Sequence, residues 1–193
     1  MFKRTSVVIF LLALTACSSA QPGAAAAKQQ PKDQPSTALE ALLSKHGQLV
    51  MKEFYDLGTV RDMGRVQLQA LVISAPSGAQ KTKGLKIQVT EAGNYERESA
   101  AFLDVDELEG LAQALVYMSD AAAKWDGQSH APYTEIIYTS KSEVQIGFYR
   151  KGSETRAFCK TGSIGTATAY LKMEQLPTLK GFVDQAITLL KSK

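Results

Sequence analysis

The sequence predicts an α+β fold built from two ββββα repeats, with antiparallel sheet or sheets and one helix per repeat. The first observation is an internal similarity, since residues 101–115, AFLDVDELEGLAQAL, align without a gap with residues 169–183, AYLKMEQLPTLKGFV, at a shift of 68. The second is that segments of alternating apolar and polar residues, typical of half-buried strands, precede both copies. The alignment has four identical positions: Ala101/Ala169, Leu103/Leu171, Leu108/Leu176 and Leu111/Leu179.

The composition is that of an ordinary globular protein, with 193 residues, 45% of them hydrophobic and 21% charged. The formal charge of +3 includes Lys3 and Arg4, which belong to a segment expected to be removed, and this leaves 20 basic against 19 acidic residues. A nearly neutral mature chain lacks the basic excess of a nucleic-acid-binding protein.

The N-terminus has the features of an export signal. Lys3 and Arg4 precede an apolar core at residues 7–14, VVIFLLAL, which is much shorter than the ~20 residues that span a bilayer. Residues 14–17, LTAC, resemble the lipobox of bacterial lipoproteins. The resemblance implies a signal peptide at residues 1–16 and lipidation of Cys17. Cleavage after residues 18–20, which would discard Cys17, and an uncleaved anchor are the alternatives.

The same resemblance implies a location in the cell envelope. Two or more acyl chains hold a protein on a membrane durably, so the lipid on Cys17 would be the membrane contact. Ser18 in the next position implies the periplasmic face of the outer membrane if the source is Gram-negative. Residues 17–37 contain three prolines and no large apolar residue, and they are expected to form a disordered tether to a domain at residues 38–193.

The first repeat is expected at about residues 48–126, after a short helix at 37–47 whose Thr37 and Glu40 match a capping box. Strands are predicted at 48–60 and 65–75, around the alternating Leu85, Ile87 and Val89, and at about 95–105. The loop after the second strand is predicted to continue through Lys81 and Lys83. The helix should begin at Asp106, pair it with Glu109 as a cap, bury a stripe of apolar residues and end near residues 125–127.

The second repeat is expected at about residues 132–193. Its strands are predicted at 133–140, from 144 through the alternation of Ile146 and Phe148, at 155–161 and at 165–171, with tight turns at 141–142, 151–153 and 162–163. The last helix is predicted at about 174–190, with Pro177 in its first turn. Its apolar stripe comprises Leu176, Leu179, Phe182, Val183, Ala186 and Leu190.

No catalytic, metal or cofactor motif is found. His46 and His130 have no partner motif, and Lys160-Thr161-Gly162 resembles the K-T-G element of serine β-lactamases without the S-x-x-K that must accompany it. The acidic residues Asp104, Asp106, Glu107 and Glu109 are explained by the dipole at a helix start rather than by a cation. Cys159 is predicted to be a small buried residue in a strand that forms no disulfide.

The order of elements is similar to that of the Whirly and purine-rich-element-binding families of single-stranded nucleic-acid-binding proteins. The resemblance covers topology only, and the neutral charge and the export signal argue against nucleic acid as the ligand. The sequence instead favours a lipid-anchored, non-enzymatic binding or assembly module with a possible envelope protein as its partner. An exported enzyme without a recognisable motif and a reused nucleic-acid-binding fold are the alternatives. The predicted contact surface mixes aromatic and cationic side chains on strands: Tyr149, Arg150, Arg156 and Phe158.

Overall fold

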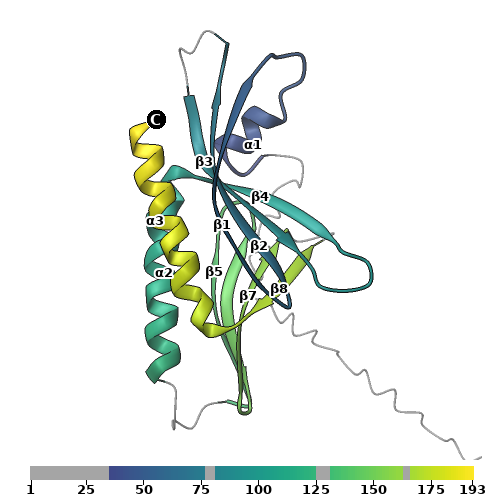
Figure 1. The fold of residues 1–193 in the computed structure, drawn as a ribbon, viewed down its shortest axis with the longest axis vertical. Helices are drawn as coiled ribbons and strands as arrows, with labels where there is room; N and C mark the ends of the chain where they lie inside the picture. The colour runs from purple at the N-terminus through teal and green to yellow at the C-terminus, as the bar shows by residue number, and fades with distance from the viewer. Residues whose placement is uncertain (1–34, 77–80, 125–130, 163–165) are drawn as a thin grey trace, which may run out of the picture. The chain divides into compact units, whose positions relative to one another are not determined.

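The computed structural model describes residues 35–76, 81–124, 131–162 and 166–193, and these residues form an α+β fold (Figure 1). They contain two four-stranded antiparallel sheets, in the orders β1-β2-β3-β4 and β5-β6-β7-β8. The elements are α1 (Ala38–Leu43), β1 (Met51–Asp62), β2 (Gly64–Ser74), β3 (Lys81–Thr90), β4 (Glu98–Asp104), α2 (Val105–Lys124), β5 (Tyr133–Thr139), β6 (Gln145–Lys151), β7 (Glu154–Thr161), β8 (Ala167–Leu171), a 3-10 turn (Met173–Gln175) and α3 (Leu176–Ser192). The predicted signal peptide, Cys17, the tether to residue 34, residues 125–127 and His130 lie outside the described residues.

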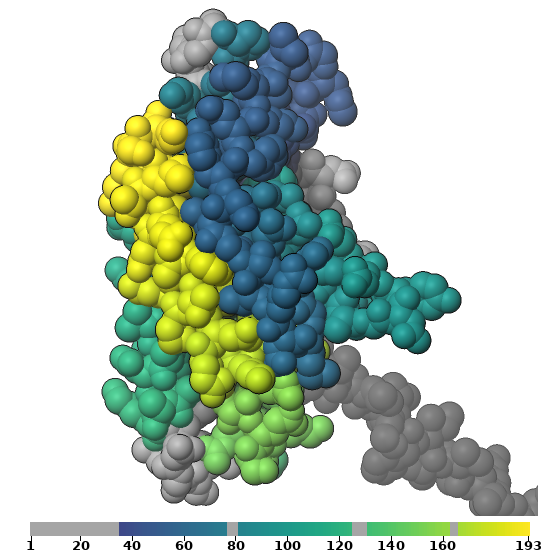
Figure 2. All heavy atoms as spheres, viewed as in Figure 1, coloured from purple at the N-terminus to yellow at the C-terminus, as the bar shows by residue number. Residues whose placement is uncertain are grey.

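The predicted order of four strands and a helix, repeated once, is confirmed. Helices α2 and α3 lie side by side and pack on the inner faces of the sheets, where one continuous apolar core includes residues of both sheets and both helices (Figure 1). Helix α3, yellow in Figure 2, lies alongside β1 and β2 and contacts both strands. Among the described helices, none combines the length and apolar content that crossing a membrane requires.

Equivalent positions of the two repeats carry equivalent contacts. The backbone N–H of Asp104 donates to Oε2 of Glu107 at 3.0 Å, and 68 residues later the N–H of Lys172 donates to Oε1 of Gln175 at 3.0 Å. The predicted cap pair Asp106/Glu109 is therefore wrong by two residues, because α2 begins at Val105. The six leucines at identical positions of the alignment are core residues. Leu179 is 1% exposed, and the other five are fully buried: Leu103, Leu108, Leu111, Leu171 and Leu176.

Helix α1 covers part of the outer face of the first sheet. Thr37 caps it as predicted, its Oγ1 accepting a hydrogen bond from the N–H of Glu40 at 3.1 Å. The carboxylate of Asp104 caps it a second time, by accepting from the N–H groups of Ala38 and Leu39 at 2.8 and 3.2 Å. Leu39 then packs with Leu71 and Ile73 in a small apolar cluster on this face. The helix ends at Leu43, four residues before the predicted Gly47.

The hairpin between β1 and β2 joins the two sheets. β1 continues to Asp62 instead of ending at residue 60, and Asp62 pairs with Gly64 across a turn at Met63. Met63 forms an antiparallel bridge with Tyr170 of β8, with N–O distances of 3.1 and 2.9 Å. A Cβ at Gly64 would lie 2.8 Å from Cβ of Ala169, so this junction requires glycine.

The β2–β3 connection differs from the prediction because Lys81 and Lys83 belong to β3 and not to a loop. Their ammonium groups donate to the backbone carbonyls of Lys193 and Leu190, both at 2.9 Å. These carbonyls lie at the C-terminal end of α3, where cations satisfy free acceptors and oppose the partial negative charge. The two lysines therefore fix the end of α3 on the first sheet.

Several predicted boundaries in the second repeat shift. The turn after β5 is longer than the predicted two residues. The N–H of Ser140 donates to the carbonyl of Val144 at 2.9 Å, and Glu143 adopts a φ of +61°. A five-residue loop replaces the expected tight turn, and β6 begins only at Gln145. β8 begins at Ala167 rather than at residue 165, and α3 extends two residues beyond the predicted end.

Candidate functional site

The outer face of the second sheet, turned away from α2 and α3, holds most of the predicted contact residues. Neighbouring strands place Tyr149 of β6 directly opposite Arg156 of β7, and Phe158 of β7 opposite Tyr170 of β8. Buried residues at the alternate positions, such as Phe148 and Cys159, point into the core on the other side. The side chains of this face can therefore meet a partner without disturbing the core.

Three tyrosines form the centre of this face, and we call Tyr133, Tyr149 and Tyr170 the tyrosine face. The rings of Tyr133 and Tyr149 stack with centroids 6.0 Å apart and planes at 24°, and Tyr170 meets Tyr149 edge-on at 6.2 Å. Tyr133 is 52% exposed and Tyr170 is 39% exposed. Tyr133 and Tyr170 were not among the predicted contact residues, although strand alternation within the predicted strands 133–140 and 165–171 could have assigned both to this face.

Two of the tyrosines, Tyr133 and Tyr149, have a raised pKa. The Tyr133 hydroxyl donates to Oε2 of Glu135 at 2.6 Å, and this hydrogen bond is the main cause that raises the pKa of Tyr133. Partial burial raises the pKa of Tyr149. Both rings therefore present a neutral apolar surface with a polar edge, a combination that is common in protein interfaces.

Phe158 is not part of the exposed surface, because only 8% of it is accessible. A Cβ at Gly147, the residue opposite it on β6, would lie 3.1 Å from Cζ of Phe158. The ring of Phe158 covers this glycine on the same side of the sheet as the three tyrosines. The prediction that Phe158 contacts a partner is replaced by a packing role.

Arg156 joins the two sheets. Its Nη1 lies 3.2 Å from Oδ2 of Asp62 in the β1–β2 hairpin, and its Nε lies 3.1 Å from Oε1 of Glu154. Two carboxylates neutralise the guanidinium, so it does not add free positive charge to the tyrosine face. Because 94 residues separate Asp62 from Arg156, no local sequence pattern indicated this contact.

Arg150 lies apart from the other predicted contact residues. It pairs with Thr134 on one side and Thr155 on the other, and strand alternation puts it on the face opposite Tyr149. Its Nε donates to the carbonyl of Gly152 at 3.1 Å in the β6–β7 turn. The structure thus brings Tyr149, Arg156 and Phe158 together and places Arg150 elsewhere.

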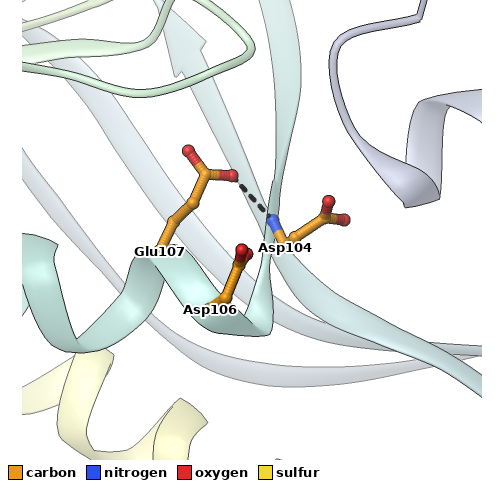
Figure 3. Close-up of side chains that lie close together, drawn as sticks. All are labelled: Asp104, Asp106 and Glu107. Atoms are coloured by element: carbon orange, nitrogen blue, oxygen red, sulfur yellow. Dashed lines mark hydrogen bonds between the residues drawn. The ribbon is translucent and has the colours of Figure 1, made fainter.

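An acidic cluster at the start of α2 has the composition of a metal site, because carboxylate oxygens of Asp104, Asp106 and Glu107 lie within 4.8 Å of one another (Figure 3). Each carboxylate already has protein partners. Asp104 caps α1, Asp106 accepts from Nζ of Lys141 at 2.7 Å, and Glu107 accepts from the N–H groups of Asp104 and Lys141 at 3.0 and 2.8 Å. The cluster is a structural junction between α1, α2 and the β5–β6 loop.

Cys159 is fully buried in β7, as predicted, and is a free thiol. Burial raises its pKa to about 12, so the nucleophilic thiolate is not available near neutral pH. The described part of the chain has several hollows at its surface. One of about 360 Å³, lined by residues that include Arg156, Lys172 and Glu174, lies beside the tyrosine face.

Comparison of the sequence with known proteins found no family model that matches it and no matching curated protein. The roles of its residues are therefore argued from their geometry.

Proposed function

We propose that this chain is a lipid-anchored protein of the cell envelope that acts as a non-enzymatic binding or assembly module. Its anchor is the lipid on Cys17, its tether is residues 17–37, and its contact surface is the tyrosine face. The observation that carries the proposal is the row of three mutually packed tyrosines on an open sheet face. Tyrosine and arginine are the residue types in which interfaces concentrate their binding energy.

The two halves of the domain support the choice of this face. In the first sheet, the outer face carries Leu71 and is covered by α1. In the second sheet, the position equivalent to Leu71 in the strand register is Tyr149, and helix α1 has no counterpart there among the described elements. The outer face of the first sheet is apolar and is covered permanently by α1. The outer face of the second sheet is amphipathic and tolerates contact with water, which a reversible interface requires.

An envelope protein is the partner that we propose. Arg156, which lies opposite Tyr149, is neutralised by Asp62 and Glu154, and the expected mature chain has 20 basic against 19 acidic residues, so the chain lacks the basic excess typical of proteins that bind single-stranded nucleic acids. Lipid anchoring raises the local concentration of the domain near such a partner, and a modest interface then suffices.

Site-specific photocrosslinking in cells tests the contact surface. A benzophenone amino acid at Tyr133 should give a crosslinked partner band, and the same probe at Tyr95, which is 92% exposed in the β3–β4 loop, should not. Tyr149→Ala should reduce the band, whereas Tyr95→Ala should leave it unchanged. Equal crosslinking from both positions, or no band at Tyr133, would refute the proposed surface.

Mass spectrometry of the purified chain tests the anchor separately. We expect a mature N-terminus at Cys17 that carries acyl chains, and Cys17→Ser should release the protein from the membrane fraction. An unmodified chain that starts after residue 20 would contradict the proposed lipidation and leave the test of the tyrosine face unaffected.

A further inference from the structure

The outer edge of strand β5 is unpaired among the described strands, and we propose that a second copy of this chain pairs with it in an antiparallel, twofold-symmetric dimer. The proposal concerns the edge of the second sheet rather than the tyrosine face. It does not depend on the proposed partner or on lipidation.

The other three sheet edges are protected against such pairing. β8 is bridged by Met63 of the β1–β2 hairpin. β1 has an irregular register between Asp56 and Gly58 and carries Lys52 and Arg61, and bulges and charges of this kind discourage added strands. The end of β4 is occupied by α1, whose first N–H groups bind Asp104.

β5 lacks these protections. Its seven residues, YTEIIYT, pair regularly with β6, without a bulge, and contain no proline, lysine or arginine. β-branched and aromatic residues make up six of the seven, and Glu135 is the single charge. A regular edge of this composition offers free backbone N–H and C=O groups to another strand. Ile137 is 38% exposed, and a strand added at this edge would bury more of its side chain.

The sequence of β5 suits pairing with itself. With the twofold axis at Ile136, all seven residues find a partner, Tyr133 lies opposite Thr139 of the second copy, and Glu135 lies opposite Ile137 of the second copy. No carboxylate then faces another directly. An axis at Glu135 would place the two carboxylates opposite each other, which is unfavourable, and an axis at Ile137 would leave Tyr133 unpaired.

Helix α2 provides a second, independent observation. Its Gly110 lies over β5, since a Cβ there would be 3.9 Å from the ring of Tyr138. Tyr117 is two helical turns further along the same face of α2 and is 63% exposed. Because α2 and β5 run in opposite directions, the rise of two helical turns from Gly110 leads us to place Tyr117 toward the N-terminal half of β5, where Thr134 is. In the proposed register Thr134 faces Tyr138 of the second copy, so the incoming strand would cover the exposed ring of Tyr117.

Light scattering during size exclusion of the full chain in a mild detergent tests the dimer. We expect a concentration-dependent dimer, and Ile137→Glu should weaken it on the order of tenfold or more, because each new carboxylate lies directly opposite Glu135 of the other copy. Tyr95→Glu adds the same charge at a remote exposed site and should dimerise like the parent. A parent that stays monomeric at its highest concentration, or a well-folded Ile137→Glu variant that dimerises equally, would overturn the proposal.

Disulfide trapping tests the register. Directly opposite residues of antiparallel strands have Cα atoms about 4.5–5.5 Å apart, a separation that disulfides accept. A mixture of Glu135→Cys and Ile137→Cys chains should form a crosslinked pair on mild oxidation, whereas either variant alone should give no more than the parent, which controls for Cys17 and Cys159. Equal crosslinking of either variant alone would refute the register centred on Ile136. Crosslinking of the mixture to another protein in place of the second copy would show that the edge binds a foreign strand, and would refute self-pairing.

Discussion

Glu107 is a buried carboxylate that holds three segments together. It accepts hydrogen bonds from the N–H groups of Asp104 and Lys141, and both donors lose their partner if the side chain is removed. We expect Glu107→Ala to lower the free energy of unfolding by about 2–4 kcal/mol, measured by urea denaturation.

Glu107→Gln is the matched control for this prediction. The equivalent position of the second repeat is Gln175, whose Oε1 makes the same bond to the N–H of Lys172. Glutamine should therefore keep the bond to Asp104 and lose part of the contact to Lys141, with a smaller loss of stability than alanine. Equal losses for both variants would show that the hydrogen bonds are not the cause.

The burial of Cys159 predicts how the free energy of unfolding depends on pH. The thiol has an ordinary pKa of 9.0, and burial raises it to about 12 in the folded chain. Its contribution to stability is fully present below pH 9 and is lost as the pH rises toward 12, because only the unfolded chain ionises there.

The comparison of the parent with Cys159→Ala isolates this effect. Between pH 7.5 and 10.5 the parent should lose about 2 kcal/mol more unfolding free energy than the variant, at 1.4 kcal/mol per pH unit above 9. In the folded parent at pH 7.5, Cys159 should also resist iodoacetamide. Fast alkylation without denaturant, or parallel pH curves for the two proteins, would contradict complete burial.

The two long helices depend on equivalent leucines. Leu108 of α2 and Leu176 of α3 are both fully buried in the shared core. We expect Leu108→Ala and Leu176→Ala to cost similar amounts, about 2–5 kcal/mol each in chemical denaturation. Val116→Ala, at a position of α2 that is 45% exposed, should change stability by less than about 0.5 kcal/mol. A near-neutral result at only one of the two leucines would show that the repeats share their pattern and not their packing.

Strand β1 depends on a single glycine for its contact with α3. Gly58 has a φ of +146° at the irregular position of the strand, and a Cβ there would overlap the ring of Phe182. Gly58→Ala should therefore cost about 2 kcal/mol or more in unfolding free energy, through backbone strain and steric overlap.

Combining Gly58→Ala with Phe182→Leu separates these two causes. The smaller side chain relieves the overlap and leaves the strain, so the double variant should be more stable than the sum of the single losses predicts. Strict additivity would mean that the backbone conformation alone accounts for the cost at Gly58.

At the scale of the whole molecule, Arg156 is expected to stabilise the packing of the two sheets against each other, because it contacts Asp62 of the first sheet from the second. Arg156 contacts Asp62, and the pair is partly buried, because 34% of the Arg156 side chain and 21% of the Asp62 side chain are exposed. A double-mutant cycle with alanine at both positions should give a coupling energy of about 0.5–1 kcal/mol. The more exposed pair of Lys141 and Asp106, with exposures of 46% and 69%, should give a smaller value. If Arg156→Ala leaves stability unchanged, its structural role is wrong and the guanidinium is again a candidate contact group.

Much of the fold could be predicted from the sequence because its signals are local and periodic. Apolar residues at helical spacing indicated the buried stripes of α2 and α3, and alternation indicated the strands. The exact repeat of 68 residues indicated that both halves are built alike, and the two equivalent capping bonds bear this out. Errors fell at the ends of elements, as at Asp106/Glu109 and at Lys81, where distant partners decide whether a strand or helix continues.

The tertiary structure alone decided which surface is open. Alternation assigns a strand residue to one face or the other, but it does not say what packs on that face. Leu71 and Tyr149 occupy equivalent places, yet α1 covers the first and leaves the second exposed, because the carboxylate of Asp104 binds the start of α1 and Lys172 stands at the matching position. The sequence thus determined the elements and their repetition, while contacts between residues far apart in the chain determined which face remains available.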